Sequence, residues 1–219
     1  MDSTSRMVAL LAALRRERNG AVADGMRFVG APCGLNLGVS LPTVRAIARA
    51  EVPDHAFARF LVSQDVRELR LAAFHIAQPE CLSLGELPEW AGALINSELA
   101  EEAAFALLSR TPILPRLFDR WILSDEPLLV YAAAMAAARW PETPLAWALR
   151  AFDALRRAVV AEAGQGSARL VAQGAVALAA AVGSRSTENR QALLRTAGSG
   201  GDAPAERYLR EELAWRLEA

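Results

Sequence analysis

Residues 40–48, SLPTVRAIA, hold the pattern that decides the fold. Ser40 is a residue of the type that caps helices, and Pro42 falls in the following turn, where its missing N–H costs nothing. Apolar residues then recur from Leu41 to Ile47 at three-residue spacing, which places them on one side of a helix. The segment therefore predicts an amphipathic helix with one buried face.

Similar signals recur about every fifteen residues, and no segment alternates with period two for long enough to predict a strand. We expect about twelve or thirteen helices. Those with the clearest limits begin at Ser40, Asp65, Ser83, Ser97 and Ser124, or span residues 145–162, 167–182, 188–196 and 203–217.

Short linkers between helices of this length predict antiparallel neighbours, and successive pairs stack into a solenoid. The fold class expected is all-α: an α-solenoid, or superhelix, of HEAT-like antiparallel helix pairs that forms a single domain over residues 1–219. A compact helical bundle is the structural alternative. In the last helix, Glu206–Arg210 and Glu212–Arg216 have the spacing of favourable ion pairs.

The charge of the chain is balanced overall but uneven along its length. All 24 basic residues are arginine, against 25 acidic residues, for a net charge of −1. Residues 1–78 hold 10 arginines and 7 acidic residues, whereas residues 79–145 hold 4 and 10. This excludes a protein held to phosphates by its total charge, so any nucleic-acid site must be a local patch.

The composition gives no indication of a metal, a cofactor or a membrane anchor. Cys33 and Cys81 lie far apart and only two histidines accompany them, so we expect neither a metal site nor a cofactor. The apolar runs 128–138 and 175–182 are too short to cross a bilayer. The expected location is the cytoplasm.

Four segments, in order, resemble the DNA alkylation repair family of AlkD-like, HEAT-like glycosylases. They are Gly38–Arg45 with the pattern G-V-x-x-P-x-x-R, Asp65–Ala73, Asn96–Glu102, and Trp121–Ala133 with the pattern W-x-x-S-D. The resemblance covers about residues 20–180. It implies a concave, arginine-lined surface that binds duplex DNA, and excision of an alkylated, cationic purine with the help of a carboxylate.

The residues that the family uses for catalysis are not matched here. The helix that begins at Ser97 has no tryptophan, and the family's aspartate aligns with an alanine. Tyr131 stands where an arginine is expected, and Val171–Leu178 replaces a helix that contains tryptophan. The resemblance therefore supports the fold more strongly than the chemistry.

Glu98, Glu101 and Glu102 share a helix face and could place a carboxylate near a DNA sugar. The alternative is that they face water and complement the helix dipole. If the protein is a glycosylase for N-alkylated purines, the candidate catalytic residues are Glu101, Glu102 and, near the lesion, Tyr131.

Four arginines on two consecutive predicted helices could form a stripe that contacts phosphates: Arg45, Arg49, Arg67 and Arg70. A solvated helix face is the alternative for them. The leading functional hypothesis is thus a monomeric protein that binds double-stranded DNA and excises alkylated purines, or only recognises damaged or structured DNA. The alternative is a non-catalytic helical scaffold for a protein partner, which the acidic middle segment favours.

Overall fold

A computed structural model describes residues 2–28, 34–161 and 167–218. Contacts divide the chain into two compact units, Met1–Leu107 and Leu108–Ala219, which we call unit 1 and unit 2 and describe separately. Within the described residues the regular structure is helical, apart from one isolated bridge between Leu35 and Val66. The all-α prediction is confirmed, and the single domain over residues 1–219 stays a prediction.

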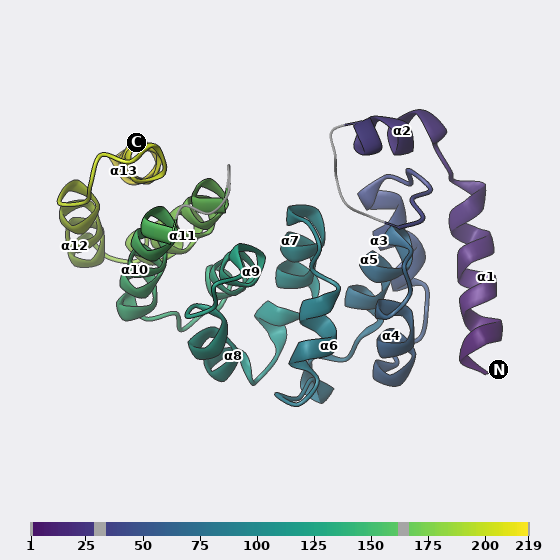
Figure 1. The fold of residues 1–219 in the computed structure, drawn as a ribbon. Coiled ribbons are helices and arrows are strands. Elements are labelled where there is room, and N and C mark those ends of the chain that lie inside the picture. The colour runs from purple at the N-terminus through teal and green to yellow at the C-terminus, as the bar shows by residue number, and fades with distance from the viewer. Residues whose placement is uncertain (1, 29–33, 162–166, 219) are drawn as a thin grey trace. The chain divides into compact units, whose positions relative to one another are not determined.

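In residues 2–28 and 34–107, unit 1 forms seven α-helices and one 3₁₀ helix, which Figure 1 shows with their labels. Helix α5 is its centre, because it contacts α3, α4 and α7, while α4 also contacts α6 and α1 packs on α3 and α4. The bounds are α1 Ser3–Arg16, α2 Gly20–Phe28, α3 Leu41–Arg49, α4 His55–Val62, α5 Arg67–Ile76, η1 Pro79–Cys81, α6 Leu87–Gly92 and α7 Ser97–Ala106.

The part of unit 2 that the structure describes, residues 108–161 and 167–218, forms one 3₁₀ helix and six α-helices. Helix α11 is its centre and contacts α9, α10, α12 and α13. The bounds are η2 Leu108–Arg110, α8 Leu114–Trp121, α9 Pro127–Ala137, α10 Leu145–Ala161, α11 Ser167–Gly183, α12 Thr187–Gly198 and α13 Pro204–Glu218.

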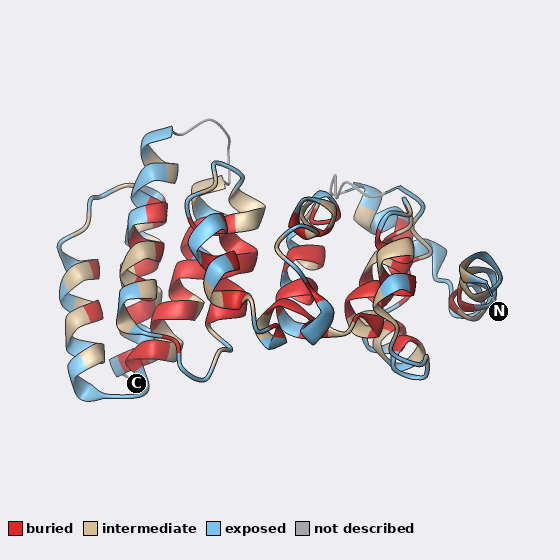
Figure 2. Cartoon of the chain, turned by 90° about the horizontal axis from the view of Figure 1, so that it is seen from below, coloured by how far each residue is buried: buried red, intermediate tan, exposed pale blue. Residues whose placement is uncertain are grey.

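In both units the helix sides that face other helices are buried and the outer sides are exposed (Figure 2). Helix α9 departs from this pattern, since every residue from Val130 to Ala137 is buried. Its alanines let a neighbour approach closely. A Cβ atom added to Gly174 of α11 would lie only 3.1 Å from Cβ of Ala134 and 3.2 Å from Cδ2 of Tyr131, so a glycine at this position fits the close α9–α11 contact without any shift of these neighbours.

Several predicted helix starts are confirmed. Ser40 caps α3, since its Oγ accepts a hydrogen bond from the N–H of Thr43 at 3.3 Å, and Pro42 lies in the first turn. Helix α7 begins at Ser97 as expected, with Asn96 as its cap. The later helices match their predicted limits within one to three residues where the structure describes both ends. Glu162, the predicted end of α10, lies outside the described residues.

The predicted start at Asp65 is wrong by two residues, because α5 begins at Arg67. The backbone carbonyl of Asp65 accepts a hydrogen bond from the N–H of Leu35 at 2.9 Å, and Val66 pairs with Leu35. This long-range pairing keeps residues 65 and 66 extended, which a local pattern does not show.

Two predicted caps also have different roles. Glu86 accepts hydrogen bonds from the N–H and Oγ of Ser83 at 2.9 Å each, but this contact closes a turn before α6. Ser124 bonds to the N–H of Glu126, and α9 has no side-chain cap.

In α13 the predicted Glu212–Arg216 pair forms at 3.4 Å, whereas Arg210 pairs with Asp202 and Glu206 accepts from the N–H of Gly201. An acceptor for Arg210 and a donor for Glu206, both outside the helix, replace the predicted Glu206–Arg210 pair.

Candidate nucleic-acid interface

The G-V-x-x-P-x-x-R segment has a structural role, which begins in the loop before α3. Gly38 has φ +70°, a conformation that glycine adopts without strain. Glu68 of α5 reaches back to this loop and accepts hydrogen bonds from the N–H groups of Leu37 and Val39. The segment thus fixes where α3 begins and so places Arg45, its last member, beside α7.

Arg45 is held by a carboxylate of α7 rather than left free. Its Nε and Nη2 donate to the two carboxylate oxygens of Glu102 at 2.8 and 2.6 Å, a bidentate pair of the stronger kind. The guanidinium lies 4.9 Å from the ring centre of Phe105. A third of the Arg45 side chain is still exposed, so its outer edge remains accessible.

Glu102 lies in the interior of unit 1, with its side chain 2% exposed. Its Oε1 also forms a short contact with Nε2 of His75 in α5. Burial raises the pKa of Glu102, but the hydrogen bonds and charges of Arg45 and His75 outweigh it and lower the pKa to about 2. At neutral pH this candidate catalytic residue is therefore an anion enclosed by two partners, and not a group facing DNA or water.

This pKa shift makes the stability of unit 1 depend on acid. The usual value of 4.5 applies to the unfolded chain, so the unfolded state binds the proton first as pH falls. The contribution of ionised Glu102 to the free energy of unfolding is complete above pH 4.5 and is lost progressively down to about pH 2. The difference between its pKa in the unfolded and folded states corresponds to about 3 kcal/mol. We expect urea unfolding of the wild type and of Glu102→Gln to differ most at neutral pH and to converge near pH 2. A constant difference across this range would contradict the assignment.

Arg67 is also committed to protein contacts, and its side chain is 4% exposed. Its Nε and Nη2 donate to Glu98 of α7 at 2.7 and 2.5 Å. Its Nη1 donates to Glu68 at 2.8 Å and to the carbonyl of Val39 at 3.1 Å. The guanidinium therefore joins α5 to α7 and to the loop before α3, and it has no surface open to a phosphate.

The remaining candidates lie at different depths. Arg70 is mostly buried and contacts Asp65 at 3.3 Å, while Arg49 is exposed at the end of α3. Glu101 is exposed on α7. In unit 2, Tyr131 is 6% exposed and packs against α11 at Gly174.

The structure pairs glutamates of the predicted catalytic helix face with arginines of the predicted DNA-binding stripe. Carboxylates of α7 at 98 and 102 neutralise arginines of α5 and α3 at 67 and 45. Sequence reasoning did not foresee this pairing and assigned no role to His75 or Glu68. The i,i+4 spacing of Glu98 and Glu102 was a usable signal, because it matches arginines on the helices that α7 packs against.

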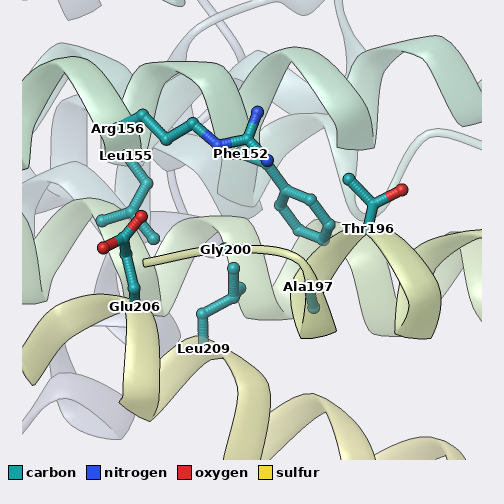
Figure 3. A pocket seen from close by; sticks show the side chains of 8 residues that line it. All are labelled: Phe152, Leu155, Arg156, Thr196, Ala197, Gly200, Glu206 and Leu209. Atoms are coloured by element: carbon teal, nitrogen blue, oxygen red, sulfur yellow. The ribbon is translucent and has the colours of Figure 1, made fainter. Parts of the chain in front are cut away.

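Two hollows among the described residues of unit 2 differ greatly in size. One lies between α10, α12 and α13 and has a volume of about 10 Å³, room for a single water molecule. Its lining includes Phe152, Leu209 and Glu206 (Figure 3). The other has a volume of about 210 Å³ and lies at the start of α9.

No cluster of three or more His, Cys, Asp or Glu side chains suited to a metal ion occurs among residues 2–28, 34–161 and 167–218. Cys81 is exposed and unpaired with another cysteine, and Cys33 lies outside the described residues. Within the same ranges no helix is both long and apolar enough to cross a membrane.

The comparisons with known proteins agree on the family and the fold. A solved structure matches 99% of this chain and 96% of its own, with a TM-score of 0.71 and 16% identity; it is described as "a new family of proteins related to the HEAT-like repeat DNA glycosylases with affinity for branched DNA structures". This likeness confirms a HEAT-like repeat fold. No curated protein matches the chain significantly. The family model described as "DNA alkylation repair enzyme" matches residues 10–173, which is most of the chain. The chain therefore belongs to the DNA alkylation repair enzyme family.

Proposed function

We propose that the protein binds branched or damaged DNA and does not excise bases from it. Membership of the DNA alkylation repair family supports DNA as the ligand, and the affinity of the structural relative supports a branched form. The observation that carries the second half of the proposal is the position of Glu102. An enclosed carboxylate that is bound by Arg45 and His75 has no access to a DNA sugar.

The phosphate contacts are assigned to the accessible arginines of α3. Arg49 is exposed, and Arg45 lies one turn before it on the same side of the helix with a third of its side chain exposed. Arg67 has a structural role, because its donors are taken up inside unit 1.

If a few guanidinium groups bind the phosphates, the salt dependence of the binding constant can be predicted. Replacement of Arg49 by alanine is expected to weaken binding to a four-way junction and to lower the slope of log K against log salt by about one. Fluorescence anisotropy between 25 and 200 mM salt, with a junction and a duplex of equal length, measures both quantities. Arg27→Ala, which removes an exposed arginine of α2 paired with Asp24, serves as the matched control and should leave the slope unchanged.

Two outcomes would contradict the proposal. Release of 7-methylguanine or 3-methyladenine from alkylated DNA by the wild type would show excision. Absence of binding to junction and duplex at 25 mM salt would exclude DNA, since phosphate contacts are strongest there. The acidic segment 79–145 would then favour the protein-scaffold alternative.

A further inference from the structure

The larger of these two hollows in unit 2 is lined by residues that take no part in the proposed phosphate contacts. It lies between the segment that leads into α9, the second half of α10 and the first turns of α11. Its volume is about 210 Å³, and it is lined by Ser124, Asp125, Pro127, Val130, Ala154, Arg157, Ala158, Ala161 and Val171.

The sequence of α10 explains why this space is empty of protein. Ala154, Ala158 and Ala161 follow one another at i, i+4 and i+7, so that three methyl groups lie along one side of the helix. Val130 and Val171 form buried walls from α9 and α11. Larger side chains at the alanine positions would fill the space, and the alanine and valine side chains that form the walls are apolar.

The polar residues of the lining are held in place by the backbone. Oγ of Ser124 accepts a hydrogen bond from the N–H of Glu126 at 3.1 Å, which leaves its O–H free to donate. Nη2 of Arg157 donates to the carbonyl of Ile122 at 2.7 Å, which orients the guanidinium. Asp125 is exposed beside them and supplies an acceptor. The lining thus combines one carboxylate, one guanidinium and one hydroxyl.

We propose that this hollow receives an unpaired purine base of a DNA branch, with guanine as the best match. The inference rests on the proposed function. The volume is below the range of about 300–1,000 Å³ typical of sites for drug-sized ligands, which favours a single ring system over a chain segment. Apolar walls suit the faces of a base. Guanine offers donors for Asp125 on its Watson–Crick edge, N1–H and the N2 amino group, and acceptors for Arg157 on its Hoogsteen edge, N7 and O6.

A branch point is the form of DNA that offers such a base at low energy. Extrusion from an intact duplex requires unstacking and unpairing, which costs a few kcal/mol, whereas a base that is already unpaired avoids most of this cost. The hollow therefore provides preference for branched over intact DNA, which phosphate contacts by themselves do not provide.

The test uses a three-way junction with one unpaired nucleotide at the branch, carrying either guanine or no base. The wild type is expected to bind the guanine junction about tenfold more tightly than the abasic one. Ala158→Phe, which fills the hollow, and Asp125→Ala, which removes the acceptor, should abolish this difference without changing the affinity for a duplex. Ala146→Phe adds the same ring to an exposed position of α10 and is the matched control.

A titration with guanosine monophosphate, followed by NMR of the methyl groups of Ala154, Ala158 and Val171, tests the hollow without DNA. Shifts in the wild type that disappear in Asp125→Ala support the site. Equal binding of the guanine and abasic junctions by the wild type would overturn this inference and leave the proposed function standing. Loss of all junction binding would overturn the proposed function, and the absence of methyl shifts in the same protein would then overturn the hollow as a base site as well.

Discussion

Glu102→Ala is expected to lower the free energy of unfolding of the protein by about 3–5 kcal/mol, because it leaves the guanidinium of Arg45 and the ring of His75 without their shared partner. Removal of one member of a buried ion pair costs far more than the pair itself contributes, since the remaining charge stays desolvated. Urea unfolding at pH 7 measures the loss. Hydrogen exchange followed by mass spectrometry should show faster exchange in α3, α5 and α7, the helices that these three side chains join.

Glu101→Ala on the same helix is the matched control for this prediction. Glu101 is exposed, and substitutions of exposed charges change stability by less than about 1 kcal/mol. Equal losses for the two variants would mean that the Glu102 contacts do not stabilise unit 1. A loss confined to Glu102→Ala, with faster exchange in α3 and α5 as well as α7, would establish the three-helix connection.

Gly38→Ala carries the second large effect, with an expected loss of at least about 2 kcal/mol. At φ +70° an alanine is strained, and its Cβ would lie 2.0 Å from the backbone oxygen of Asn19 and 2.8 Å from the nitrogen of Ala23. Backbone atoms cannot turn away as a flexible side chain does. Because the carbonyl of Leu37 also accepts the N–H of Asn19 at 2.9 Å, the shift would propagate into the start of α2. Thermal unfolding followed by circular dichroism measures it.

Gly25→Ala separates this local cause from a general effect of replacing glycine. Gly25 lies inside α2, and a Cβ there would meet nothing within 4 Å. Alanine at such a position is expected to be neutral or to stabilise the helix by up to about 1 kcal/mol. If Gly38→Ala were as harmless as Gly25→Ala, the loop before α3 would not have the tight approach described above.

Together these predictions give the family-like segments of unit 1 structural rather than catalytic roles. Gly38 and Ser40 set the start of α3, Glu68 holds the loop before it, and Arg45 and Glu102 join α3 to α7. The segments Gly38–Arg45 and Asn96–Glu102 thus have structural roles within unit 1.

The helical class, the cap at Ser40 and most helix limits could be predicted from the sequence, because capping and apolar periodicity act within one or two turns. The start of α5 and the pairing of Glu206 in α13 could not. In the first case a hydrogen bond from Leu35 to Asp65 decides the limit, and in the second the N–H of Gly201 replaces Arg210 as the partner.

For the candidate site, the sequence alone specified which residue types were available: arginines in the segments that form α3 and α5, and three glutamates in the segment that forms α7. The packing of unit 1 then pairs Glu102 with Arg45 and Arg67 with Glu98, and it buries Glu102 and Arg67 while Arg49 and Glu101 stay at the surface. Periodicity defines a helix face, but the charge opposite that face comes from residues 31 and 57 positions away in the chain, and these residues meet only when the helices pack.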